Sequence, residues 1–433
     1  MPTLRVITLG CSKNTVDTEH LLARVEGAYD ILPEDGGEPA DVLLINTCGF
    51  IGDAKKESID TILKAGAMKK DGLIGKIGVF GCLSQRYSSE LPGLIPEVDA
   101  WFGARDLGSV ARWLWPDAKP SAGRYMQSPL PYAYLKISEG CDRTCSYCAI
   151  PLIRGAHKSV PMEELVSEAQ ALASKGVREL ILIAQDTTFY GLDLYKKRAL
   201  ADLVGRLSEI DGIEWIRIHY SFPTDFPDDV LDMMATNPKV CRYLDIPLQH
   251  SADNVLSAMR RGVDGAQTRD LISRIRERVP GIVLRTTMMV GHPGEGRKEF
   301  SDLMDFVRWA KFERLGAFEY SSEEDTWSYL HYGDPVSPRT KHSRLRRLME
   351  LQRDISLEFN RSRVETRCRV LVDAVMGDDL VCRSCYESPE VDGEILVAYD
   401  KAMGRPAAEM PGHFIEVDLT WAGDYDLRGV FIC

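Results

Sequence analysis

The sequence has no apolar run long enough to cross a membrane, and its first residues lack a secretory pattern. A spanning helix needs about 20 apolar residues, whereas "VLLINT" and "ELILIA" have only the length of buried strands. The opening "MPTLRVITLG" has no basic segment followed by an apolar one. These absences predict a soluble, cytoplasmic protein with no membrane partner.

The chain also lacks an excess of positive charge. It contains 53 Lys and Arg against 65 Asp and Glu in 433 residues, a net charge of -12. That balance disfavours a protein that holds nucleic acid through a broad basic surface. The length allows two or three domains, each with its own core.

Two further signatures are missing. "GLIGKIGVFG" offers glycines but not the G-x4-G-K-[ST] order of a phosphate loop, so nothing supports ATP hydrolysis. The 11 cysteines are odd in number and occur in short clusters, which disfavours a disulfide framework. Thiolates bound to metal in a reducing compartment explain them better.

Residues 3–114 alternate short apolar runs with amphipathic stretches, which predicts a parallel sheet flanked by helices, one of them from Thr15 to about Glu26. Three predicted strands end in a cysteine beside a glycine: Cys11, Cys48 and Cys82. Because the carboxyl ends of parallel strands form one crevice, these cysteines can meet. A single cysteine there would be explained as a small buried residue, but three at the same topological position favour a metal site.

Residues 113–131 are rich in Pro, Gly and Ser and predict a linker. Six further strands alternate with helices over residues 127–360, with polar residues at the strand ends. This pattern predicts an open, partial α/β barrel whose active site lies at the carboxyl ends of its strands. A basic helix follows within "SPRTKHSRLRRLMELQRDISLEFNRSR".

The hydrophobic period changes to two over residues 364–433, which predicts a small antiparallel β-barrel. From Glu365 onward this segment has six basic and fourteen acidic residues, a net charge of -8. Such a barrel is poorly suited to a phosphate backbone but would attract a basic protein.

Cys141, Cys145 and Cys148 form a C-x3-C-x2-C array in "KISEGCDRTCSYCAIPLIRG". Four thiolates close a zinc or iron-sulfur site, whereas three leave one metal position open. A structural zinc site would need another ligand, for which His157 is the only nearby candidate. The spacing therefore favours a reactive cluster.

The array, with Tyr147 before its third cysteine, resembles the radical S-adenosylmethionine superfamily. The resemblance implies that Cys141, Cys145 and Cys148 bind a 4Fe-4S cluster whose fourth iron binds S-adenosylmethionine. Together with the upstream three-cysteine domain and the downstream barrel, the chain resembles the methylthiotransferases. In that family Cys11, Cys48 and Cys82 would hold a second 4Fe-4S cluster, and the barrel would be a TRAM domain. No catalytic residue is assigned beyond these ligands.

"GCSKNTVDTE", "IPLQH" and "RTTMMVGHPGE" are similar to the RimO-type branch of the methylthiotransferases. That branch modifies the β-carbon of an aspartate in small-subunit ribosomal protein twelve. The resemblance implies S-adenosylmethionine as both methyl donor and radical source, and an electron donor such as a flavodoxin-type reductant. Nucleic acid is then not the modified substrate. The alternative is the MiaB-like branch, which modifies tRNA adenosine and has a similar layout.

Other polar residues at predicted strand ends remain open to two interpretations. Gln185, Asp186, Gln249 and His250 could contact S-adenosylmethionine, but ordinary turn chemistry or a structural histidine explains them equally well. Lys136 could touch a carboxylate, although a solvated strand-end lysine is the default. Cys382 and Cys385 form a lone C-x2-C, a weak metal signal, and are best explained as unligated thiols or an adventitious disulfide.

Overall fold

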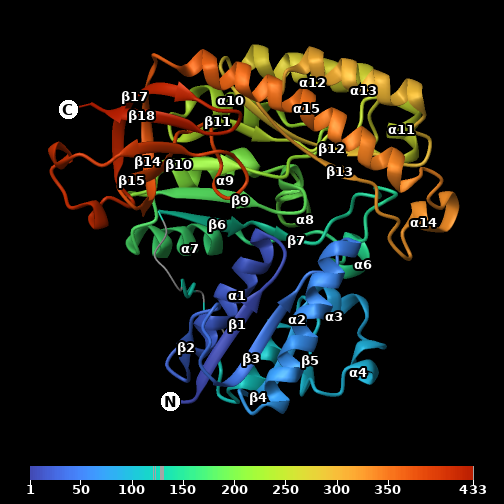
Figure 1. Ribbon diagram of the computed structural model, residues 1–433, viewed down its shortest axis with the longest axis vertical. Coiled ribbons are helices and arrows are strands. Elements are labelled where there is room, and N and C mark those ends of the chain that lie inside the picture. Colours follow the sequence, from blue (N-terminus) through green and yellow to red (C-terminus); the bar gives the residue numbers. More distant parts are fainter. Residues whose placement is uncertain (120, 122, 127–130, 433) are drawn as a thin grey trace.

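The computed structural model describes residues 1–119, 121, 123–126 and 131–432 of the chain. An N-terminal α/β unit, a larger α/β core and a C-terminal barrel follow one another along the sequence (Figure 1). The predicted linker begins within α5 (Leu107–Leu114), and its described residues from 115 to 131 form no helix or strand. Its other residues, including the predicted core boundary at 127, lie outside the described residues.

The N-terminal unit is a parallel sheet with helices on both faces, as predicted. Its strand order is β2-β1-β3-β4-β5. The strands are β1 (Thr3–Thr8), β2 (Asp30–Leu32), β3 (Ala40–Thr47), β4 (Ile74–Gly81) and β5 (Ala100–Trp101). The helices are α1 (Ser12–Val25), α2 (Gly52–Lys70), α3 (Cys82–Arg86), α4 (Leu91–Leu94) and α5. Helix α1 begins three residues before the predicted Thr15, directly after Cys11.

Apolar side chains hold a layer of helices against each face of the sheet. Leu21 and Leu22 of α1 pack with Val110 of α5 on one face of the sheet. Ile62 of α2 packs with Leu91 on the other face. Because both faces are covered, the strand β3 reads as a nearly continuous buried run, typical of a parallel sheet.

The core contains six parallel strands, as predicted. Their order is β13-β12-β11-β10-β9-β6, and within the described residues β6 and β13 do not pair, so the sheet is an open, partial barrel. The strands are β6 (Tyr132–Lys136), β9 (Glu179–Ile183), β10 (Trp215–Ile218), β11 (Val240–Asp245), β12 (Val283–Val290) and β13 (Arg314–Glu319). A two-stranded ribbon of β7 (Ser138–Glu139) and β8 (Lys158–Ser159) brackets the cysteine loop.

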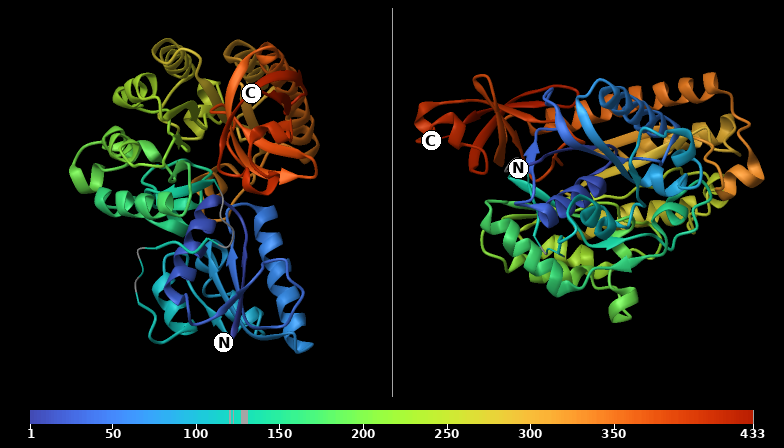
Figure 2. Two further views of the ribbon diagram at one scale, coloured as in Figure 1. Left: turned by 90° about the vertical axis from the view of Figure 1, so that its left-hand side faces the viewer. Right: turned by 90° about the horizontal axis from the view of Figure 1, so that it is seen from below.

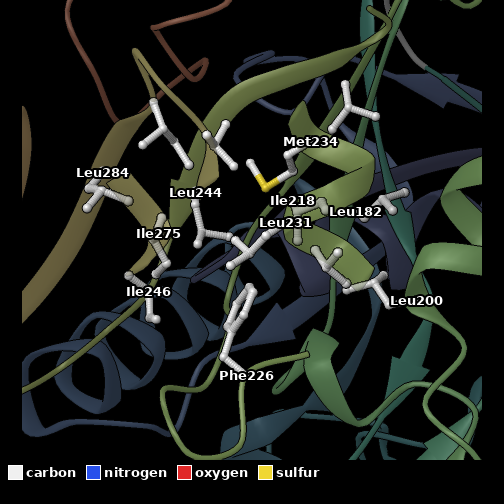
Figure 3. Close-up of a cluster of buried hydrophobic side chains, with 14 of the residues drawn as sticks. Leu182, Leu200, Ile218, Phe226, Leu231, Met234, Leu244, Ile246, Ile275 and Leu284 are labelled. Atoms are coloured by element: carbon white, nitrogen blue, oxygen red, sulfur yellow. The ribbon is translucent and has the colours of Figure 1, made fainter. Parts of the chain in front are cut away.

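Helices cover the outer side of this sheet (Figure 2). Those whose apolar side chains join the core cluster are α7 (Met162–Ser174), α9 (Leu200–Ser208), α10 (Asp228–Thr236), α12 (Gly265–Arg278), α13 (Arg297–Ala310) and the later α15 (Pro338–Arg363). The short helices α6 (Ile150–Arg154), α8 (Leu192–Tyr195) and α11 (Asp253–Ala258) lie outside this cluster. Figure 3 shows the outward-facing Leu182, Ile218 and Leu244 packed on side chains of the helices that join the cluster. Each such Leu or Ile, once buried, contributes about 1.5–3 kcal/mol.

Helices α14 (Trp327–Tyr332) and α15 (Pro338–Arg363) lead to a closed barrel of strand order β14-β15-β16-β18-β17. Its strands are β14 (Arg367–Met376), β15 (Asp379–Arg383), β16 (Ile395–Ala398), β17 (Phe414–Ala422) and β18 (Leu427–Phe431). The predicted small barrel is confirmed, with one difference. The pair β16–β18 is parallel, whereas the other pairs are antiparallel.

The segment 384–392, here called the plug, follows β15 and enters the open side of the core barrel. The Glu390 carboxylate accepts hydrogen bonds from the Tyr132 and Tyr134 hydroxyls, both at 2.9 Å. The Tyr243 hydroxyl donates to Asp392 at 2.7 Å. Just before the plug, Arg383 donates to the fully buried Glu179 at 2.7 Å. These contacts hold the C-terminal barrel against the inner side of the core sheet.

No helix in the described part of the chain is both long and apolar enough to cross a membrane.

Candidate active site

All six predicted cluster cysteines line one cavity of about 340 Å³ between the N-terminal unit and the core. Cys11, Cys48 and Cys82, here called the N-terminal trio, come from the carboxyl ends of β1, β3 and β4. Cys141, Cys145 and Cys148, the core trio, come from the loop between β7 and α6. The two sets, distant in sequence, therefore face a common space.

Backbone geometry explains the N-terminal trio. Cys11 is the N-cap residue of α1, and Cys82 opens α3. The Cys48 amide donates to the Ser58 hydroxyl of α2 at 3.0 Å, and that hydroxyl donates back to the Cys48 carbonyl at 2.9 Å. Gly10 has φ +97°, and a Cβ there would lie 3.0 Å from the Cys48 sulfur. A side chain at that position would push the strand ends apart.

The core trio lies on a loop held from both sides. Gly140 has φ +72° at the turn that begins the loop. A Cβ atom at this position would lie 2.1 Å from the Ala156 carbonyl oxygen, so a side chain does not fit there. The Arg143 amide donates to the Cys141 sulfur at 3.4 Å. The Ser146 amide donates to the Met259 carbonyl at 3.0 Å, which ties the loop to α11. Backbone contacts of the protein itself therefore hold the shape of this loop.

Arg154 joins the two trios. It ends α6, which begins two residues after Cys148, and its side chain is only 1% exposed. The guanidinium donates across the domain boundary to Asn14 at 2.6 Å and Asp17 at 2.8 Å, and its Nε lies 3.3 Å from the Cys82 sulfur. A cation donating to a ligand sulfur stabilises the thiolate form.

Arg261 holds an equivalent position beside the core trio. One of its amino groups lies 3.3 Å from the Cys145 sulfur and 3.4 Å from the Tyr147 hydroxyl. Its guanidinium also stacks 4.1 Å above the Phe222 ring. Hydrogen bonds to ligand sulfurs are one means by which a protein sets the reduction potential of an iron-sulfur cluster.

Burial makes several of these thiols poor acids by themselves. It raises the pKa of Cys48 and Cys141 to about 11 and that of Cys148 to about 12. Burial also raises the pKa of Cys82, against the opposing charge of Arg154. A metal ligand must be a thiolate, so loading these positions with iron has to release protons.

The donor set suits iron-sulfur clusters. Within the described ranges no three His, Cys, Asp or Glu side chains converge closely enough to bind a single metal ion. A tetrahedral zinc would draw its sulfurs to about 2.3 Å from one centre, whereas a cubane binds each thiolate through a different iron. His157, the alternative zinc ligand, instead pairs with the Ser159 hydroxyl at 3.0 Å and does not line the cavity. The assignment of the cysteines as ligands stays a prediction.

Of the other polar residues predicted at strand ends, some line the cavity and others have structural partners. Gln185 and Gln249 line the cavity, whereas Asp186 pairs with Arg143 at 2.8 Å. His250 is fully buried and accepts a hydrogen bond from the Ala252 amide at 3.0 Å, a structural role. The default explanation of Lys136 is wrong. Its side chain is only 14% exposed and pairs with Asp17 and Glu139, because the N-terminal unit covers it.

Cys382 and Cys385 lie away from the cavity, at the barrel and its junction with the core. Both are free thiols, as is the buried Cys241 beside Cys385 in the same cluster. They take no part in either trio. Cys433 lies outside the described residues.

Several cavity residues escaped prediction: Lys13, Asn14, Arg154, Arg261 and Tyr220. Lys13 and Asn14 follow Cys11 closely, and Arg154 follows Cys148 closely, so nearness to a ligand was the available signal. Arg261 and Tyr220 are remote in sequence from every cysteine of the trios, and only the fold brings them together.

Three family profiles match the chain. "Radical SAM superfamily" matches residues 135–307, "Uncharacterized protein family UPF0004" residues 3–103, and "TRAM domain" residues 364–432. The boundaries 3–114, 127–360 and 364–433 remain predictions.

Solved structures share the fold at low identity. The radical S-adenosylmethionine methyltransferase TsrM from Kitasatospora setae aligns with a TM-score of 0.54 at 14% identity, over 74% of this chain and 75% of its own. The cobalamin-dependent S-adenosylmethionine radical enzyme OxsB aligns with a TM-score of 0.52 at 12% identity, over 82% of this chain and 62% of its own. These likenesses concern the fold alone.

Curated relatives match almost from end to end. A protein of Cytophaga hutchinsonii is 46% identical over 99% of this chain and 98% of its own length. One of Porphyromonas gingivalis is 47% identical over 98% of this chain and 97% of its own. Both bear the name ribosomal protein uS12 methylthiotransferase RimO. Because these relatives match nearly the whole chain, and because the radical SAM and TRAM profiles match its core and its C-terminal barrel, the chain belongs to the RimO family of radical S-adenosylmethionine methylthiotransferases.

Proposed function

We propose that this enzyme transfers a methylthio group to the β-carbon of an aspartate in ribosomal protein uS12. The observation that carries the proposal is that both cysteine trios line one cavity. Sulfur insertion needs the radical source and the sulfur source to act on the same carbon. A cavity of about 340 Å³ admits a side chain between them.

Membership of the radical S-adenosylmethionine superfamily brings one 4Fe-4S cluster and S-adenosylmethionine. The core trio would hold this cluster, and the N-terminal trio would hold a second one. When bound, these groups supply a methyl group, an abstracting radical and a sulfur atom, which protein side chains cannot provide.

The chain's own residues position these groups and exclude water. Arg154 and Arg261 each donate to one ligand sulfur of a trio. Phe50 and Phe318 line the cavity while remaining 38% and 56% exposed, so they lie where it meets solvent. Exposed aromatic side chains at a binding site are typical anchors for a protein substrate.

The charge of the barrel supports a basic protein substrate. Its net charge of -8 would attract a Lys- and Arg-rich ribosomal protein and repel a tRNA phosphate backbone. We place the reaction in the cytoplasm, with a flavodoxin-type protein as electron donor.

A product assay tests the proposal. The enzyme is reconstituted without oxygen, given S-adenosylmethionine and a reductant, and incubated separately with uS12 and with tRNA. The proposal predicts a mass gain of one methylthio group on the uS12 aspartate. A product on tRNA alone would establish the MiaB-like alternative, and no 5'-deoxyadenosine with either substrate would leave only an iron-sulfur scaffold.

Iron content tests the second cluster. The wild type should bind about eight irons per chain, and the triple variant Cys11→Ala, Cys48→Ala, Cys82→Ala about half, if each trio holds one cubane. The matched control replaces Cys241, Cys382 and Cys385, which lie outside the cavity, and should keep the full content. Full iron in the first variant would refute a cluster at the N-terminal trio.

A further inference from the structure

Lys13 is a buried lysine that has no hydrogen-bond or ion-pair partner among the described residues. It is the second residue of α1, two positions after Cys11, and is 5% exposed. Its side chain lines the cavity, and its Nζ lies 3.2 Å from the centroid of the Tyr220 ring. This cation–π contact is the interaction that holds the ammonium in the part of the chain that the structure describes. A buried charge normally has a counter-charge.

The other cations of the cavity are already engaged. Arg143 pairs with Asp186, Arg154 with Asp17, and Arg261 donates to the Pro247 carbonyl. Among the described residues, no Asp or Glu lines the cavity. Among the described cations that line the cavity, Lys13 is therefore the one that no protein acceptor engages, although Arg261 has only neutral acceptors and its Nε is buried without one.

The surface beneath Lys13 is held in a strained conformation. Tyr220 has φ +57°, unusual for a bulky residue, and Gln249 across the cavity has φ +75°. Two hydrogen bonds of 3.1 Å fix the Tyr220 backbone, one to Asp245 and one from the Thr187 amide. Residues with such dihedral angles persist where the surrounding structure holds them, and they cluster at functional sites. The ring face then steadies the ammonium through a cation–π contact.

We propose that Lys13 anchors the side-chain carboxylate of the substrate aspartate. The inference rests on the proposed function and names the group that the cavity recognises. The β-carbon of aspartate is bonded directly to its carboxylate carbon, so holding the carboxylate places the reacting carbon beside the N-terminal trio. The amino end of α1, from which Lys13 projects, adds positive potential. An adenine base carries no carboxylate and would leave Lys13 unpaired.

Peptide binding tests this role without depending on turnover. The reconstituted full-length enzyme is titrated with a labelled basic peptide of the uS12 sequence that contains the aspartate, and with the same peptide carrying asparagine. The wild type should bind the aspartate peptide about a hundredfold more tightly. Lys13→Met should abolish this preference, and Lys13→Arg should retain most of it.

The control is Lys56→Met, which removes a lysine that is 76% exposed and paired with Asp60; its preference should equal that of the wild type. Iron per chain and the Kd for S-adenosylmethionine are measured on every variant, and Lys13→Gln replaces Lys13→Met if the latter loses iron.

A preference for the aspartate peptide that survives in the Met or Gln variant overturns the proposal, as does a wild type that binds both peptides equally. An unchanged preference with a raised Kd for S-adenosylmethionine would assign Lys13 to the cofactor's carboxylate. Modification of tRNA alone in the product assay would instead overturn the proposed function.

Discussion

Replacing Arg154 by Met should loosen the N-terminal unit from the core. The side chain would keep an unbranched apolar stem but become shorter and lose its charge and its donors. In the wild type these reach Asn14 at 2.6 Å, Asp17 at 2.8 Å and Glu139 at 3.0 Å. Asp17 is itself buried, so the substitution removes one of the two cations that compensate its charge.

The magnitude follows from that burial. Removing one partner of a buried ion pair costs about 3–5 kcal/mol. Lys136 remains on Asp17, which places the cost near the lower limit, at about 3 kcal/mol. Since every 1.4 kcal/mol is a factor of ten, the equilibrium for local opening of α1 should shift by about a hundredfold.

Amide hydrogen exchange of α1 measures this shift directly, because protection reports the free energy of local opening. The control is Arg274→Met, whose 46% exposed guanidinium lies 3.6 Å from Asp228 and whose loss should change stability by less than about 1 kcal/mol. Equal protection of α1 in the two variants would refute the role assigned to Arg154. In a double-mutant cycle, Asp17→Asn should reduce the cost of Arg154→Met, because the stranded carboxylate is gone.

Three further perturbations can be checked independently. Burial by itself would raise the pKa of Glu387, but Arg363 and Arg314 hold that pKa at about 2. The carboxylate therefore stabilises the fold above its ordinary pKa of 4.5. About 3 kcal/mol should be lost as pH falls from there toward 2. Urea unfolding at several pH values should show this slope in the wild type, and a shallower one in Glu387→Gln. Arg261→Gln should shift the reduction potential of the core cluster to more negative values in an anaerobic redox titration, because a donor to the Cys145 sulfur is lost; an unchanged potential would contradict that contact. Phe318→Ser should raise the KM for the uS12 peptide about tenfold at constant kcat, while Leu94→Ser, 73% exposed and outside the cavity, should leave KM unchanged; equal KM values would exclude Phe318 as an anchor.

The positions of the cysteines were accessible from sequence because they depend on local pattern. Each cysteine of the N-terminal trio follows an apolar run, and β1, β3 and β4 are neighbours in the sheet, so their ends meet at one edge. The core trio was evident from its spacing alone. The strand and helix pattern likewise predicted the six-stranded open barrel and the small C-terminal barrel.

The shared cavity was not accessible in the same way. It depends on how the N-terminal unit docks on the core, and contacts between remote residues fix that docking. Asp17 meets Lys136 and Arg154, which lie 119 and 137 residues away. The hydrophobic periodicity of the sequence does not predict ion pairs between residues so far apart in the chain. The parallel pair β16–β18 and the plug escaped prediction for the same reason, since each depends on the path of the chain in space.

The plug has a consequence for how the chain can be divided. Without residues 384–392 and the preceding Arg383, the core would expose a buried acid, Glu179, and Arg217 would be its one remaining cationic partner among the described residues. The hydroxyls of Tyr132 and Tyr134 would lose their acceptor, Glu390. The TRAM domain is therefore part of the folding unit of the core barrel. Truncation before residue 364 should abolish radical chemistry through misfolding, even though no residue of the TRAM domain lines the cavity in the described part of the chain.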